Sequence, residues 1–143
     1  MAEALFRDLV RDRADYEVQS AGVGAYPGDA ASPHTADILR ELGMDASRFR
    51  SQPLTKDLLD AATHVFTMSR SHMAAIESEF PEDADKVYLL SEFTADDALR
   101  GRDVSDPFGS GRAAYDEVRD SLRRMLPSVL AYIEQTFNRK TPE

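Results

Sequence analysis

Apolar residues in the first thirteen positions recur at the spacing of a helix. Met1, Leu5 and Leu9 fall on one stripe, as in a helix that packs a single face against a core. Helix starts usually carry Ser, Thr, Asp or Asn as a cap, and no such residue precedes this stripe. We therefore predict that the chain begins inside a helix, which runs from residue 1 to 13.

Three shorter segments have the patterns of strands. Residues 16–23 alternate apolar and polar positions and then reach glycines, which predicts a short strand followed by a loop at residues 24–31. Residues 64–68 and 87–90 are continuous apolar runs, which are typical of strands covered on both faces of a parallel sheet. The sequence therefore predicts a sheet whose strands lie far apart in the chain.

Helical patterns fill the intervals between these strands. Ser32 and Pro33 form a cap and first-turn pair that predicts a helix at residues 33–42. A short helix is expected after Thr55, and residues 71–80 show helical apolar spacing. Because strands alternate with helices, we predict an α/β layered fold with right-handed crossovers.

The longest apolar stripe lies near the end of the sequence. Its members recur at intervals of three and four and predict a long helix that packs on the sheet: Tyr115, Val118, Leu122, Met125, Leu126, Val129, Leu130, Ile133 and Phe137. Pro127 lies inside the stripe, removes one backbone donor and is expected to kink the helix.

Length and charge narrow the class of protein. A chain of 143 residues, 42% of them hydrophobic, has the size of one globular domain. We therefore expect a single domain over residues 1–143, with disorder only in the last few residues. The net charge of −9 repels nucleic acid and anionic lipid surfaces, so neither is an expected partner. No segment has the pattern of a membrane span or a secretory signal, which predicts a cytoplasmic protein.

The sequence contains no cysteine, so disulfides, thiolate metal sites and thiol nucleophiles are excluded among these 143 residues. His34, His64 and His72 are too far apart in the chain to suggest a local metal motif. We expect structural or surface roles for His64 and His72, because isolated histidines are seldom ligands. We expect no metal and no cofactor.

One loop carries a candidate for acid–base chemistry. Residues 101–111, GRDVSDPFGSG, contain Asp103, Asp106, Pro107 and Phe108. Proline restricts the residue before it to extended conformations, so Pro107 would aim the carboxyl group of Asp106. A carboxylic acid aimed in this way could donate a proton to a leaving oxygen and recover it from water. The alternative is that Asp-Pro followed by Gly is only turn chemistry.

Several motifs together, in their order and spacing, resemble the low-molecular-weight protein phosphatase family. They are MAEALF at residue 1, SAGV at 20, A-x-P-H ending at 34, S-x-P-L-T at 51, D-K-V-x-x-L at 85 and DVSDPFG at 103. The resemblance is to the bacterial branch that includes protein arginine phosphatases. It implies a three-layer α/β fold with a parallel sheet of strand order 2-1-3-4. It also implies hydrolysis of phosphotyrosine or phosphoarginine in proteins through a cysteinyl-phosphate, with phosphorylated proteins and phosphate ion as partners.

The resemblance implies a site in two parts. A loop of the form C-x-x-x-x-x-R-S-P binds the phosphate and supplies the thiolate nucleophile, and the aspartate of the D-P loop, which matches Asp106, is the general acid. In the family, M-A-E-A follows directly after C-R-S-P. The first strand, the loop and the cysteine, about fifteen residues, are therefore expected to be missing here. We expect the polypeptide to be inactive, with the strands on either side separated by a gap of about 10 Å.

Four other residues are interpreted in the light of the resemblance. Ser20 would support the phosphate loop by a hydrogen bond, or else cap its own turn. Phe108 would form one wall of the substrate cleft, or else pack on a helix. Tyr115 is better explained by the core stripe, and Phe49 stands where many family members have a histidine.

Three interpretations stay open at this point. The sequence is an N-terminally shortened reading of a working phosphatase, or it is a pseudophosphatase or interaction domain. In the second case a partner could lend the missing strand by β-augmentation. The third is an arsenate reductase on the same fold, although the thioredoxin-coupled type needs additional cysteines and the sequence has none.

Overall fold

The structure, a computed structural model, describes residues 1–24 and 26–140. Its elements follow one another as α1 (Ala2–Leu9), α2 (Pro33–Glu41), α3 (Lys56–Ala61), β1 (Val65–Thr67), α4 (Arg70–Glu79), η1 (Pro81–Lys86), β2 (Val87–Leu89), η2 (Leu90–Phe93) and α5 (Arg112–Lys140), where η marks a 3-10 helix. Ala25 in the predicted loop, and residues 141–143 where the sequence predicts disorder, lie outside the described residues.

Side-chain caps begin three of the helices. In each, a hydroxyl accepts a hydrogen bond from the backbone N–H three residues on, at distances of 3.2 to 3.4 Å: Ser32 for α2, Thr55 for α3 and Ser69 for α4. These bonds satisfy donors that the first helical turn leaves open. Helix α2 ends as predicted, because Gly43 follows it with a φ of +79°, a conformation that costs glycine little. Helix α1 is shorter than predicted and gives way to a turn at residues 10–12.

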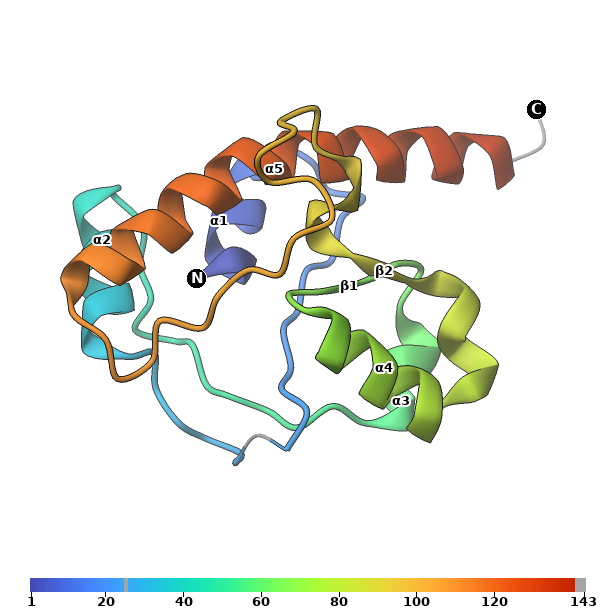
Figure 1. The fold of residues 1–143 in the computed structure, drawn as a ribbon, viewed down its shortest axis with the longest axis horizontal. Coiled ribbons are helices and arrows are strands. Elements are labelled where there is room, and N and C mark those ends of the chain that lie inside the picture. The colour runs from blue at the N-terminus through green and yellow to red at the C-terminus, as the bar shows by residue number, and fades with distance from the viewer. Residues whose placement is uncertain (25, 141–143) are drawn as a thin grey trace.

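Strands β1 and β2 form a parallel sheet, in which Val65 lies opposite Val87 and Thr67 lies opposite Leu89. Helix α4 connects the two strands. In Figure 1 the sheet lies between α5 on one side and α3 and α4 on the other. The predicted α/β layered fold with parallel strands is therefore confirmed.

Residues 16–23 do not form the predicted strand. Their one pairing is an isolated parallel bridge between Gly22 and Pro53. It is held by hydrogen bonds from the Gly22 N–H to the Gln52 carbonyl (2.9 Å) and from the Leu54 N–H to the Gly22 carbonyl (3.0 Å). A strand requires a neighbour that supplies a ladder of hydrogen bonds, and the described residues supply none beside residues 16–21.

Within the described residues, β1 is paired along one edge only. Val65 and Phe66 are half-buried, so the prediction that both faces of this strand are covered holds only in part. Val87 and Leu89 of β2 are buried as predicted. Further apolar side chains that pack on the main core also remain half-buried, namely Met1, Phe6, Met68 and Val104.

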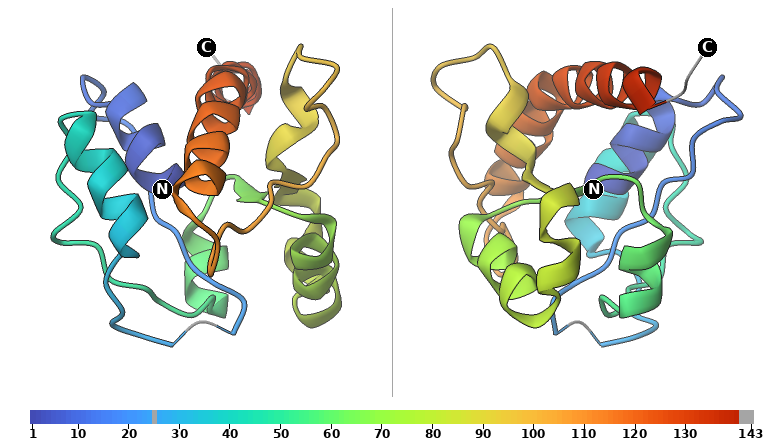
Figure 2. Two further views of the ribbon diagram at one scale, coloured as in Figure 1. Left: turned by 60° about the vertical axis from the view of Figure 1, so that its left-hand side comes forward. Right: turned by 90° about the vertical axis from the view of Figure 1, so that its right-hand side faces the viewer.

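The main core lies between α5 and the two helices α1 and α2, which Figure 2 shows beside α5. Its buried members are Leu5, Leu39, Leu90, Leu122, Met125, Leu126 and Val129. The predicted stripe of α5 is confirmed in its middle, and the helix continues through Pro127. The prediction is wrong for Phe137, which is 52% exposed because α5 extends past the rest of the molecule (Figure 1).

Candidate active site

The acid loop, residues 101–111, holds Asp106 in a tight turn. The Asp106 Oδ1 accepts a hydrogen bond from the Phe108 N–H (3.0 Å), and the Ser110 N–H donates to the Pro107 carbonyl (2.9 Å). Gly109 completes the turn with a φ of +81°. The Asp106 side chain is exposed, and its Oδ2 has no hydrogen-bond partner among the described residues. A carboxyl group held by one oxygen can still carry and donate a proton from the other.

A buried serine fixes the start of this loop. Ser91 is 1% exposed; its Oγ donates to the Arg102 carbonyl (2.6 Å), and its own carbonyl accepts from the Gly101 N–H (3.2 Å). Sequence reasoning missed this residue, because a serine directly after an apolar strand gives no sign of what it will contact. The loop is therefore attached to the short helix η2 that follows β2.

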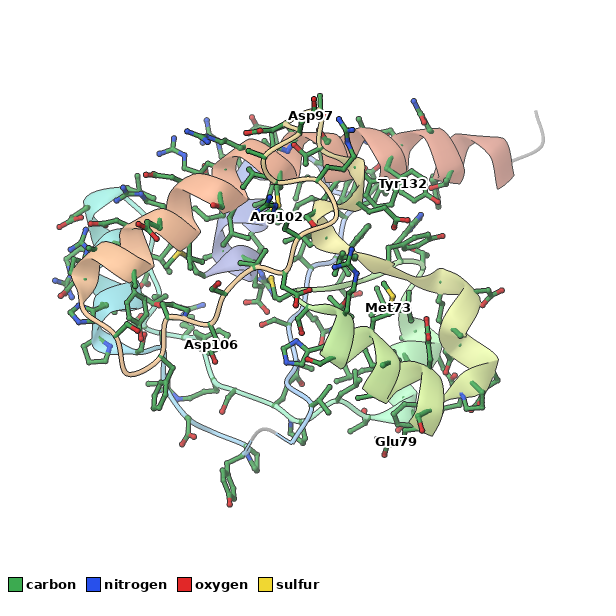
Figure 3. The ribbon with its side chains drawn as sticks, in the orientation of Figure 1. Met73, Glu79, Asp97, Arg102, Asp106 and Tyr132 are labelled. Carbon is green, nitrogen blue, oxygen red and sulfur yellow. The ribbon has the colours of Figure 1, made fainter. Side chains whose placement is uncertain are left out.

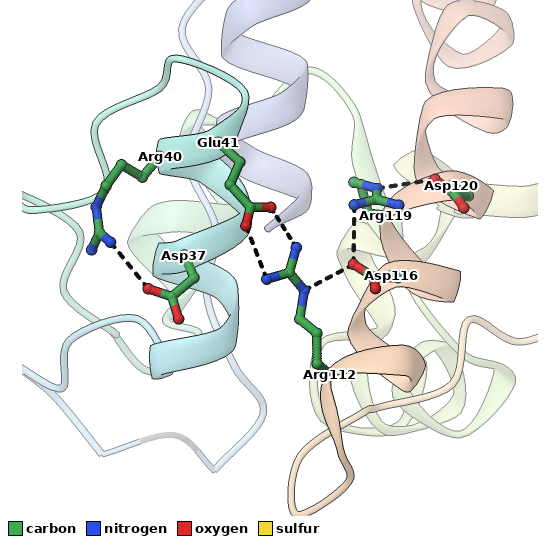
Figure 4. A network of polar contacts seen from close by, with 7 residues as sticks. All are labelled: Asp37, Arg40, Glu41, Arg112, Asp116, Arg119 and Asp120. Atoms are coloured by element: carbon green, nitrogen blue, oxygen red, sulfur yellow. Dashed lines mark hydrogen bonds and ion pairs between the residues drawn. The ribbon is translucent and has the colours of Figure 1, made fainter.

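An arginine fixes the end of the loop. Arg112, the first residue of α5, makes a two-pronged ion pair with Glu41 of α2, and its Nε donates to the Asp116 Oδ1 (2.9 Å), as Figure 4 shows. The Arg112 guanidinium holds the pKa of Glu41 below its ordinary value. Arg119 extends the network from the next turn of α5 through Asp116. The acid loop is thus secured at both ends while its middle stays exposed.

Pro107 and Phe108 take different positions in the loop. A cavity of about 220 Å³ separates the loop from α5, with Pro107, Asp106 and Ser110 on one side and Ala114 on the other. Phe108 does not line this cavity, and its side chain is 81% exposed. The alternative that Phe108 packs on a helix is therefore wrong, whereas its role as a cleft wall stays a prediction.

Ser20 contacts the first turn of α1. Its Oγ donates to the Glu3 Oε1 (3.1 Å), and its carbonyl accepts from the Gln52 Nε2 (2.9 Å). The hydrogen bond that the structure gives the Ser20 hydroxyl therefore goes to α1 and not to its own turn. Support of a phosphate loop by Ser20 stays a prediction. Phe49 is half-buried and lines a second cavity, of about 460 Å³, together with Arg7, Arg48 and Arg50.

The histidines are not brought together. His34 lies against the ring of Tyr115 at 4.9 Å between ring centroids, and the His64 Nε2 is 2.7 Å from the Thr136 Oγ1. His72 is exposed on α4. In the part of the chain that the structure describes, no cluster of side chains could hold a metal ion, and no helix is long and apolar enough to cross a membrane.

The layered fold, the D-P-F-G loop and the buried Tyr115 have counterparts in a known protein family. The family described as low molecular weight phosphotyrosine protein phosphatase matches residues 1–140. This chain belongs to that family. Tyr115 is 5% exposed, which confirms its place in the core stripe of α5.

Individual relatives carry two kinds of name. A protein-arginine-phosphatase of Bacillus subtilis is 39% identical over 127 residues, which cover 88% of this chain and 82% of the relative. A low molecular weight protein-tyrosine-phosphatase of Streptomyces coelicolor is 30% identical over 143 residues, covering 94% of this chain and 85% of the relative. The family therefore includes enzymes named for both substrates at this level of similarity.

Solved structures agree with the fold. The YwlE arginine phosphatase of Geobacillus stearothermophilus has a TM-score of 0.84 at 33% identity and covers 99% of this chain and 88% of its own. A YwlE variant with serine in place of the active-site cysteine carries a phosphoryl group on that serine. It has a TM-score of 0.83 at 35% identity and covers 93% of this chain and 86% of its own.

Proposed function

We propose that this chain supplies the acid half of a protein phosphatase site, and that Asp106 is its general acid. The observation that carries the proposal is the geometry of Asp106, whose Oδ1 is held by the Phe108 N–H while Oδ2 is free in an exposed loop. A general acid must have an exposed free oxygen, because the leaving group has to reach it.

The proposed reaction has two steps. In the first, a thiolate from the family's phosphate loop attacks phosphorus, the bond from phosphorus to the leaving oxygen or nitrogen breaks, and Asp106 gives its proton to the leaving group. In the second, water attacks phosphorus of the cysteinyl-phosphate and Asp106 takes a proton from the water. The bond from phosphorus to sulfur breaks, which releases inorganic phosphate and restores the thiolate. The phosphorylated serine of the YwlE variant supports a phosphoryl-enzyme intermediate in that relative.

Phosphoarginine in proteins is the substrate class that we propose. Two relatives named protein-arginine-phosphatase are 39% and 37% identical to this chain, whereas the tyrosine-phosphatase of Streptomyces coelicolor is 30% identical. The 143 residues contain no thiol, so we expect no turnover from this polypeptide by itself.

The test is a fusion protein. The N-terminal segment of YwlE that carries the active-site cysteine is joined ahead of Met1, and phosphate release is measured from a phosphoarginine peptide and from an aryl phosphate. We expect the fusion to release phosphate and the 143-residue chain to release none. Asp106→Asn in the fusion should lower kcat/KM by about 10²- to 10⁴-fold.

The matched control for this test is Asp97→Asn. Asp97 is an exposed aspartate on the same connection, and Figure 3 shows it far from Asp106. The control should leave kcat/KM within about twofold, because exposed substitutions far from the reaction change little. Equal losses in the two variants, or no loss with Asp106→Asn in an active fusion, would remove Asp106 from the mechanism.

A second candidate function is an interaction domain that accepts a strand. The open edge of β1 and the half-buried Phe66 and Met68 favour it, since an exposed sheet edge is a template for an added strand. The 143-residue chain, alone or with its partner, should then be monodisperse in ultracentrifugation and melt cooperatively. Aggregation in every condition would count against this candidate.

A further inference from the structure

The start of the acid loop is joined to the turn between β1 and α4. The Val104 N–H donates to the carbonyl of Met68, which directly follows β1, at 2.7 Å. One residue earlier, the Asp103 Oδ1 accepts a hydrogen bond from the backbone N–H of Arg70, the first residue of α4, at 2.9 Å. The two bonds hold the loop against the end of a strand and the beginning of a helix.

Asp103 accepts from a different backbone N–H of α4 than the N-cap residue does. The N-cap residue Ser69 already accepts from the His72 N–H at 3.3 Å, so Asp103 satisfies a different free donor of the first turn. A carboxylate at this end of a helix is also favoured by the helix dipole, and a bond to a charged acceptor is stronger than a neutral one. The bond therefore links two segments that are 33 residues apart in the chain.

Beyond Val104 the loop has no comparable anchor before α5. The hydrogen bonds that the backbone N–H groups of residues 105–110 donate stay inside the turn itself. The Phe108 N–H donates to the Asp106 Oδ1, and the Ser110 N–H donates to the Pro107 carbonyl. Asp103 lies only two residues before Ser105, where this free span begins. Its bond to Arg70 is thus the last side-chain contact that holds the loop before the turn leaves the body of the molecule.

We propose that Asp103 is a positioning residue for Asp106, acting through its hydrogen bond to the Arg70 N–H. The link to catalysis rests on the proposed function of Asp106, whereas the link to loop position does not. Loss of the Asp103 carboxylate should free the span 105–110 to rotate about Val104. The turn that holds the Asp106 Oδ1 on the Phe108 N–H would then be populated for less of the time.

The test compares three variants of the 143-residue chain by ¹⁵N NMR. Asp103→Ala removes the acceptor, Asp103→Asn keeps an oxygen in the same place, and Ser69→Ala removes the other cap of α4 without touching the loop. In Asp103→Ala the Arg70 amide should exchange about three- to tenfold faster, and the heteronuclear NOE of residues 105–110 should fall. Asp103→Asn should restore both values in part, because its amide oxygen accepts the hydrogen bond but carries no charge. Ser69→Ala should leave residues 105–110 unchanged.

A pH titration separates positioning from a merely structural role. The Phe108 amide shift should follow the ionisation of Asp106 because the two are hydrogen-bonded. The amplitude of this shift should fall about twofold or more in Asp103→Ala and stay unchanged in Ser69→Ala. If a variant of the 143-residue chain does not fold, hydrogen exchange of the same residues is measured on that variant in the fusion protein.

The proposal is overturned if residues 105–110 of Asp103→Ala stay as ordered as in the parent, or if Ser69→Ala loosens them equally. If Asp106→Asn leaves kcat/KM of an active fusion protein unchanged, Asp106 is not the general acid. That result would not contradict the effect of Asp103 on the position of the loop.

Discussion

Removal of the buried Ser91 hydroxyl should destabilise the molecule measurably, although it deletes a single oxygen atom. Ser91 is 1% exposed and its Oγ is 2.6 Å from the Arg102 carbonyl, so Ser91→Ala removes a short, covered hydrogen bond. A hydrogen bond of this kind contributes about 0.5–1.5 kcal/mol net. We therefore expect a cost of about 1 kcal/mol.

The shift in melting temperature follows from the chain length. At about 2.1 cal/mol/K of unfolding entropy per residue, 143 residues give about 0.3 kcal/mol/K, so the loss corresponds to about 3 °C. Urea unfolding and thermal melts of Ser91→Ala and Ser105→Ala provide the assay, since Ser105 is an exposed serine on the same loop. Ser105→Ala should change stability by less than about 0.5 kcal/mol. A Ser91→Ala variant as stable as the parent would refute the view that this bond anchors the loop.

Other contacts give predictions of different size. Leu122 is a core residue that is 1% exposed, so Leu122→Ala should lower the free energy of unfolding in urea by about 2–5 kcal/mol. Leu9→Ala should lower it far less, because Leu9 is 42% exposed. Similar losses in the two variants would contradict the described core. A hydrogen bond from the Tyr16 hydroxyl, and to a lesser extent one from Arg13, holds the pKa of Glu134 below its ordinary 4.5. The stability that ionised Glu134 contributes is therefore present above pH 4.5 and is lost as pH falls through the lowered pKa. Glu134→Gln should flatten this acid-side loss in urea midpoints measured on both sides of that pH, and an unchanged profile would refute the assignment.

Local sequence signals were enough for most of the helices. Ser32 and Pro33 specify the start of α2 by chemistry that acts within one turn, and Thr55 does the same for α3. The apolar spacing of α5 predicted Leu122 and Val129 as core residues, because a long stripe has to face the rest of the molecule. In these cases the information lies within a few residues of the element.

The errors concern contacts between distant segments. Residues 16–23 have a strand-like alternation, yet no ladder forms beside residues 16–21 in the described structure. Phe137 keeps the spacing of the α5 stripe, but it is 52% exposed. A periodic pattern predicts which face is apolar and does not say how far the partner extends.

The candidate site divides in the same way. The Asp-Pro step predicted a carboxyl group aimed by its neighbour, and the structure places Asp106 in a tight exposed turn. The loop is held by Ser91, Asp103 and Arg112, whose partners lie 11 to 71 residues away in the chain. No local sequence pattern predicts these contacts. Sequence reasoning therefore pointed to Asp106 as the candidate acid, and the structure was needed to find what holds its loop.

The role of Asp106 as proton donor is tested most directly by the leaving-group dependence of the fusion protein. A general acid matters most when the leaving oxygen is basic, and little when the leaving group departs readily as an anion. We predict that Asp106→Asn lowers kcat/KM by about 10²- to 10⁴-fold for phenyl phosphate and much less for p-nitrophenyl phosphate. An equal loss for both substrates would contradict proton donation by Asp106.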